Sequence, residues 1–138
     1  MRFWDASAII PLCVDEPNSA RLRALHMADP GVVVWWSCVV ECWSAFARQR
    51  RDGALDLEGE EAARAVLAAL QPSWVELQPG EAVRVQAGRL LRVHALRASD
   101  ALQLSAALVW AGGAAAEVVV LDRRLRDAAR IEGLRPVP

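Results

Sequence analysis

Four acidic residues, Asp5, Glu41, Asp100 and Asp122, stand near points where the chain passes from an apolar run into a helical stretch. Carboxylates gathered in one place repel one another, and a hard divalent cation is the simplest partner that holds them together. A bound cation of this kind activates water and neutralises charge on a phosphodiester. If the four acids converge, the sequence therefore predicts metal-assisted hydrolysis with Mg²⁺ or Mn²⁺ as the cofactor.

Each acid also has a purely structural interpretation. Asp5 and Asp122 can be turn residues that follow strands. Asp100 can simply favour the positive end of the helix that it opens. Glu41 is harder to explain in this way, because its neighbours Val39, Val40, Cys42 and Trp43 are apolar and a solvated position is therefore disfavoured.

Alternating strands and helices must position these acids. Apolar or β-branched runs predict strands at Arg2–Trp4, Val32–Trp36, Trp74–Leu77, Val118–Leu121 and Leu134–Val137. Helical patterns separate them, at Ala6–Cys13, Ser19–Ala28, Ser37 to Arg51, Leu57–Leu70, Glu81 to about His94, Asp100–Trp110 and Arg123–Ile131. Asn18, Ser37 and Ser99 are the expected helix caps.

Continuously apolar strands separated by helices indicate a parallel sheet covered on both faces, hence a three-layer α/β/α sandwich. In such sheets ligands bind beyond the carboxyl ends of the strands. Asp5, Glu41, Asp100 and Asp122 are all expected at that edge. No repeat or linker divides the chain, so we expect residues 1–138 to form a single domain.

The composition narrows the function further. The chain has 138 residues, of which 54% are hydrophobic and 24% charged, which argues against a disordered protein. No apolar run approaches the ~20 residues of a membrane span, and we expect a cytoplasmic protein with no membrane partner. All 16 basic residues are arginine. The lack of lysine excludes a Walker-type phosphate loop and Schiff-base chemistry.

Two arginine clusters flank the acids in the sequence. Arg48, Arg50 and Arg51 end the helix of Glu41, and Arg123, Arg124, Arg126 and Arg130 follow Asp122. Arginine binds phosphate through paired hydrogen bonds, so we expect Arg48, Arg123 and Arg124 to contact an RNA backbone. The alternative is that these side chains stay solvated and complement helix dipoles.

The segments around the four acids resemble the PIN domain of the VapC toxins. The resemblance rests on Phe3–Ala8, Val40-Glu41, Val120–Leu125 and, most specifically, on Leu96–Leu104, which reads Leu-Arg-Ala-Ser-Asp-Ala-Leu-Gln-Leu. It implies a PIN-like fold and a metal-dependent endoribonuclease that acts as the toxin of a type II toxin–antitoxin pair. It further implies a cognate antitoxin, a homodimer, and transfer RNA or ribosomal RNA as the substrate.

The resemblance also implies residue roles. Asp5 and Asp100 would bind the metal directly, and Glu41 and Asp122 directly or through water. Many members of the family carry threonine or serine two residues before the last acid, where this chain has Val120. Ser7 is a candidate for a site hydroxyl, although it can instead cap the first helix.

Two other functions remain open from the sequence. One is a catalytically silent PIN-like module that binds RNA or a protein. The other, less favoured, is a phosphatase with an aspartate nucleophile, loosely suggested by Asp5-Ala6-Ser7. That class needs an aspartate at position 7 and usually a lysine, and the chain has neither. Among six tryptophans, Trp35, Trp36 and Trp43 are not all expected in the core, so one can belong to a protein interface.

Overall fold

The computed structural model describes all 138 residues, and its five strands form one parallel sheet in the order β3-β2-β1-β4-β5. Phe3 of the central strand pairs with Val33 on one side and Val118 on the other. The predicted parallel sheet is thus confirmed. The strands are β1 (Arg2–Trp4), β2 (Val32–Trp35), β3 (Val75–Leu77), β4 (Glu117–Val119) and β5 (Arg135–Val137).

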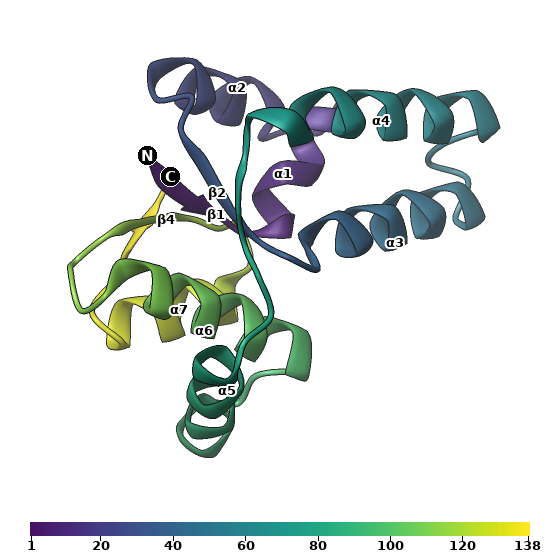
Figure 1. Ribbon diagram of the computed structural model, residues 1–138. Coiled ribbons are helices and arrows are strands. Elements are labelled where there is room, and N and C mark those ends of the chain that lie inside the picture. The colour runs from purple at the N-terminus through teal and green to yellow at the C-terminus, as the bar shows by residue number, and fades with distance from the viewer.

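Helices cover both faces of this sheet, which makes the predicted α/β/α arrangement correct (Figure 1). One face carries α1 (Ala6–Cys13), α2 (Ser19–Ala28), α3 (Cys38–Arg51) and α4 (Leu57–Leu70). The other carries α5 (Glu81–Val93), α6 (Ala98–Ala111) and α7 (Arg123–Ile131). A short 3₁₀ turn, Gln71–Ser73, leads from α4 into β3. None of the helices combines the length and the apolar character that crossing a membrane requires.

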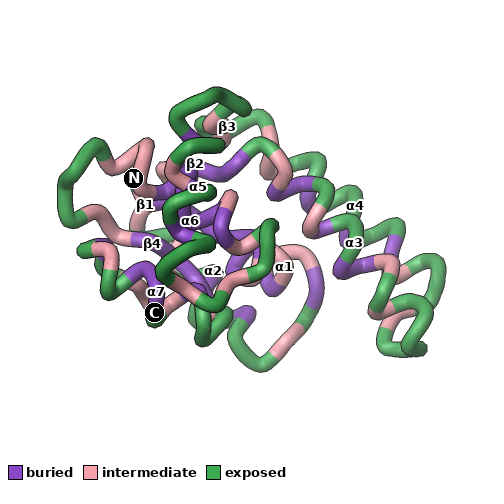
Figure 2. Tube along the Cα trace, turned by 90° about the horizontal axis from the view of Figure 1, so that it is seen from below, coloured by how far each residue is buried: buried purple, intermediate pink, exposed green.

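The buried positions of β1, β2 and β4 are apolar on both faces because successive side chains enter different cores. Trp4 and Val34 pack among α1–α4, whereas Phe3 and Val33 pack among α5–α7. Figure 2 shows the buried positions concentrated along the strands and the inner sides of the helices. The buried run of β2 ends at Trp35, and the next residue, Trp36, is 50% exposed.

Aspartates, rather than the predicted serines and asparagine, provide the side-chain caps, and they do so for α1, α4 and α7. Asn18 and Ser37 occupy N-cap positions but form no side-chain cap bond, and α6 begins one residue before Ser99, which is therefore not its cap. Asp5 and Asp122 cap α1 and α7 by accepting hydrogen bonds from the Ser7 and Leu125 amides. Asp56 caps α4 in the same way, by accepting a hydrogen bond from the Gly59 amide.

The strand β4 is displaced toward the N-terminus relative to the prediction, Val118–Leu121. It begins at Glu117 and ends at Val119. The Leu121 amide donates to Ser7 Oγ at 3.0 Å instead of to a neighbouring strand. That bond turns the chain away from the sheet ahead of Asp122.

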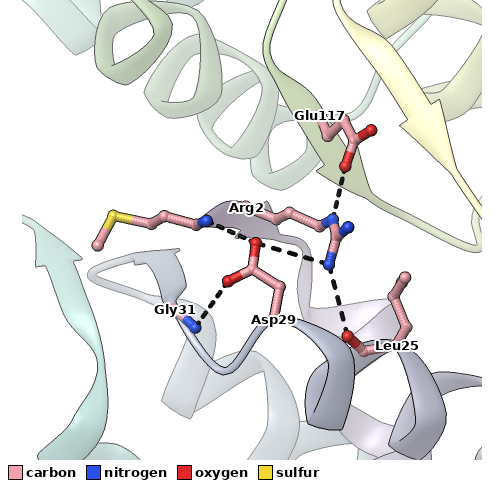
Figure 3. Close-up of polar contacts among 6 residues, drawn as sticks. Arg2, Leu25, Asp29, Gly31 and Glu117 are labelled. Carbon is pink, nitrogen blue, oxygen red and sulfur yellow. Dashed lines mark hydrogen bonds and ion pairs between the residues drawn. The ribbon is translucent and has the colours of Figure 1, made fainter.

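A polar cluster ties the amino ends of the central strands together (Figure 3). Arg2 Nε donates to Glu117 Oε2 at 2.6 Å, and Arg2 Nη1 lies 3.6 Å from Asp29 Oδ2. Asp29 also accepts a hydrogen bond from the Gly31 amide. These contacts join β1 to β4 and to the turn that leads into β2, at the sheet edge opposite Asp5.

We predict that Leu90→Ala lowers the free energy of unfolding by about 2–5 kcal/mol, because Leu90 is fully buried where α5 packs on α6. Its neighbour Leu91 is 46% exposed, so Leu91→Ala should cost less than about 1 kcal/mol. Urea unfolding followed by circular dichroism measures both. Equal losses in the two variants would contradict this account of the α5–α6 contact.

Candidate active site

The structure brings all four predicted acids to one cleft beyond the carboxyl ends of the strands. Asp5 and Asp122 lie where β1 and β4 give way to helices, Glu41 comes from α3 and Asp100 from the first turn of α6. The chain changes direction across the sheet between β1 and β4, which is where open parallel sheets bind ligands. Ser7 and Arg48 line the same cleft.

Asp5 is the most deeply placed of the four, with 7% of its surface exposed. Its Oδ2 accepts the Ser7 amide at 2.9 Å, which both caps α1 and fixes the carboxylate. Burial raises the pKa of Asp5 to about 6, and the nearby charges of Glu41 and Asp100 push it in the same direction. The bond from Ser7 opposes this rise without cancelling it.

Glu41 is held by two side chains that the sequence did not single out for this purpose. Ser37 Oγ donates to Glu41 Oε1 at 2.7 Å, and Gln103 Nε2 donates to the same oxygen at 3.0 Å. Burial raises the pKa of Glu41 and the charge of Asp100 adds to the rise, while the two donors act in the opposite sense. The expectation that Glu41 avoids a solvated face agrees with its partial burial.

Asp100 and Asp122 form the more open side of the cleft. Partial burial raises the pKa of Asp100, the charge of Asp122 raises it further, and Arg97 and Arg124 lower it. Asp122 is exposed, and its Oδ1 accepts the Leu125 amide at 2.9 Å. Asp100, placed in the first turn of α6, does benefit from the positive end of that helix, so its structural interpretation and a site role are compatible.

Ser7 links the beginning of α1 to the chain after β4. Its hydroxyl accepts the amides of Leu121 at 3.0 Å and Asp122 at 3.4 Å. The predicted alternative, a cap of the first helix, is wrong because Asp5 fills that position. Val120, where a hydroxyl was expected from the resemblance, is buried in the core. The hydroxyl of Ser7 thus contacts the backbone of the segment that carries Asp122.

The arginines lie on two sides of the acids. Arg48 lines the acidic cleft itself, and Arg123 and Arg124 line an adjoining cleft that shares Asp100 and Asp122 with it. The adjoining cleft also contains two residues that were not predicted, Arg97 and Ser99. Proximity to Asp100 in the sequence is the signal that could have indicated them. Gln103 carries a similar signal, since it lies one helical turn after Asp100.

The four carboxylates share a cleft without forming a tight cage. No three histidine, cysteine, aspartate or glutamate side chains are grouped closely enough in this structure to hold a metal ion. The donor set nevertheless suits a hard cation, because it consists of oxygen atoms and three of its carboxyl groups have raised pKa values. The site is therefore compatible with a cation that keeps several of its waters.

Comparison with known proteins identifies relatives over the full length of the chain. The Mycobacterium tuberculosis proteins ribonuclease VapC45 and ribonuclease VapC49 are each 33% identical over 139 residues, which covers 99% of this chain and 94% of theirs. No family model matches the chain.

Solved structures share the fold at lower identity. PAE2754 from Pyrobaculum aerophilum has a TM-score of 0.69 at 19% identity, with 98% of this chain and 82% of that chain covered. Mycobacterium tuberculosis VapC20, described as a sarcin–ricin loop cleaving toxin, has a TM-score of 0.69 at 19% identity, covering 93% and 95%. FitAcB from Neisseria gonorrhoeae has a TM-score of 0.66 at 15% identity, covering 100% and 97%. By its full-length identity to the two ribonucleases and by its fold, the chain belongs to the VapC family of PIN-domain ribonuclease toxins.

Proposed function

We propose that the protein is a metal-dependent endoribonuclease, the toxin of a type II toxin–antitoxin pair, formed by a single PIN domain over residues 1–138. The observation that carries the proposal is the meeting of Asp5, Glu41, Asp100 and Asp122, from four separate segments, in one cleft. The identity to two VapC ribonucleases supports hydrolysis of RNA as the reaction at that cleft.

Electrostatics support a divalent cation, Mg²⁺ or Mn²⁺, as the cofactor. Without a cation, burial and mutual repulsion disfavour the charged forms of Asp5, Glu41 and Asp100, which is the source of their raised pKa values. Asp5 and Asp100 would hold the cation directly, and Glu41 and Asp122 would hold it directly or through water. When bound, the cation supplies activation of water and neutralisation of phosphate charge.

The arginines give the RNA backbone a path across the acids. Arg48 stands within the acidic cleft, while Arg123 and Arg124, joined by Arg97, stand in the adjoining cleft beyond Asp100. A strand of RNA that contacts both clefts places a phosphodiester over the shared residues. Ser7, whose hydroxyl holds the loop of Asp122, supports the shape of this junction.

The partners follow from the family and remain proposals. We infer a cognate antitoxin and a homodimer, and the half-exposed Trp36 and partly exposed Trp43 are available for a protein interface. We infer transfer RNA or ribosomal RNA as the substrate. VapC20 is a sarcin–ricin loop cleaving toxin, but at 19% identity its substrate does not decide between the two for this chain. A cytoplasmic location follows from these substrates.

The first test is cleavage of total cellular RNA by the purified protein. We expect discrete fragments with Mg²⁺ or Mn²⁺, none with EDTA, and a more than about 100-fold loss of rate for Asp5→Asn and Asp100→Asn, since even outer partners of metal ligands cost ~10–100-fold. Asp15→Asn, at an exposed carboxylate two residues after the end of α1, is the control and should cleave normally. Binding without cleavage would favour the silent PIN-like module, and a trapped phospho-aspartate would favour the phosphatase.

The RNA path predicts a change in salt dependence. Arg123→Gln combined with Arg124→Gln should lower the slope of log affinity against log salt by about 1.4, at ~0.7 for each contact to single-stranded RNA. The measurement is RNA binding in EDTA at several salt concentrations. Arg21→Gln, at an exposed arginine of α2, should leave the slope unchanged. An unchanged slope in the double variant would remove these arginines from the path.

The raised pKa of Asp5 predicts a pH-dependent stability in the absence of metal. Its pKa is about 6 in the folded protein against an ordinary value of 3.8, so ionisation destabilises the fold, and stability falls as the pH rises from about 4 to about 6. Asp5→Asn keeps a cap acceptor and removes the charge. At pH 7 in EDTA the free energy of unfolding of this variant should be higher than that of the native protein by up to about 3 kcal/mol.

Urea unfolding at several pH values checks this prediction. The advantage of Asp5→Asn should vanish near pH 4, where both side chains are uncharged. Addition of Mn²⁺ at pH 7 should stabilise the native protein and not the variant. An advantage that is the same at pH 4 and pH 7 would show that charge burial is not its cause.

A further inference from the structure

Gln103 is a polar side chain in the buried part of α6, with 1% of its surface exposed. Its Nε2 donates to Glu41 Oε1 at 3.0 Å, while its Oε1 is buried without a hydrogen-bond partner. A buried carbonyl without a partner costs free energy, and an apolar side chain of similar size would avoid that cost. Packing alone therefore does not account for glutamine at this position.

Gln103 and Ser37 both donate to the same oxygen of Glu41. They come from different parts of the fold, Gln103 from α6 on one face of the sheet and Ser37 from the turn that begins α3 on the other. Two donors on one oxygen fix the position of Oε1 and restrict rotation of the carboxylate about its bond to the side chain. They also leave Glu41 Oε2 without any donor from the protein.

Gln103 reaches Glu41 from behind the cleft. Glu41 lines the acidic cleft, whereas Gln103 does not, and instead lines a small, mainly apolar cavity that Asp5 also lines. The amide must turn its NH₂ group toward Glu41, because an ionised carboxylate only accepts hydrogen bonds. The orphaned carbonyl of Gln103 is the consequence of this orientation.

We propose that Gln103, together with Ser37, is a positioning residue that presents Glu41 Oε2 to the cation of the active site. The inference rests on the proposed metal-dependent function and deepens it. The donors occupy Oε1 and hold the side chain in place, so that Oε2 is the oxygen that meets the cation or one of its waters. Loss of either donor lets the carboxylate turn and weakens cation binding, without removing a ligand.

The test is titration of the RNA-free protein with Mn²⁺ by isothermal calorimetry, so that binding is read without any cleavage. Gln103→Met, which keeps the size and removes the amide, should raise the Kd for Mn²⁺ by ~10–100-fold, the range for outer partners of metal ligands. Its urea midpoint should stay close to that of the native protein, because removal of the orphaned carbonyl offsets the lost bond to Glu41. Ser37→Ala should shift the Kd in the same direction.

Ser105→Ala is the matched control. Ser105 is also fully buried in α6, and its hydroxyl donates to the Val83 carbonyl at 2.6 Å, away from the acids. This variant should lose stability and keep the native Mn²⁺ affinity. A Gln103→Met protein that loses affinity only as much as Ser105→Ala does would overturn the proposal.

A double variant tests whether the effect passes through Glu41. Glu41→Gln should itself weaken Mn²⁺ binding, and adding Gln103→Met to it should produce little further loss. Additive losses would mean that Gln103 affects Mn²⁺ binding independently of Glu41, and they would overturn the inference. If the native protein binds Mn²⁺ and Gln103→Met binds it equally well, only this inference fails. If the native protein does not bind Mn²⁺, the proposed metal-dependent function fails with it.

Discussion

Repulsion among four carboxylates at the switch point between β1 and β4 is the constraint around which this end of the molecule is built. The chain after β1 and after β4 carries Asp5 and Asp122 to this edge, and α3 and α6 carry Glu41 and Asp100 there, where burial makes the charged forms of Asp5, Glu41 and Asp100 costly. The protein limits this cost with hydrogen bonds that occupy one oxygen in each of three carboxylates: Asp5 Oδ2, Glu41 Oε1 and Asp122 Oδ1. The second oxygens of Glu41 and Asp122 accept no hydrogen bond from the protein, which is consistent with the proposed cation site.

The same bonds serve the fold. Asp5 and Asp122 end their strands and begin their helices with one oxygen, so the helix caps and the acidic cleft are made by the same side chains. The structural and functional interpretations of these aspartates are therefore not rivals. Family membership comes from the full-length relatives, and the geometry adds to it an account of how each acid is held.

The sequence was sufficient for the features that depend on local pattern. The apolar strands, the parallel sheet and the edge at which the acids meet all follow from which residues are apolar and where helices interrupt them. It was insufficient for features that depend on contacts between distant segments. Gln103 and Glu41 are 62 residues apart, and Ser7 and Leu121 are 114 apart, so neither bond leaves a local signature. The caps assigned to Ser37 and Ser99 failed locally: the hydroxyl of Ser37 donates to the side chain of Glu41, four residues on, and α6 begins at Ala98, one residue before Ser99.

The position of β1 in the middle of the sheet bears on when a newly made chain can become active. Its partner β4 is separated from it by more than 100 residues, and the clamp between Arg2 and Glu117 closes over the same interval. Contacts of such long range form late, because the entropy of closing a large loop is lost before the contacts can stabilise the closed chain. A chain still emerging from the ribosome therefore holds Asp5 and Glu41 but neither β4 nor Asp122. Interrupted synthesis yields fragments in which the acidic cleft cannot assemble.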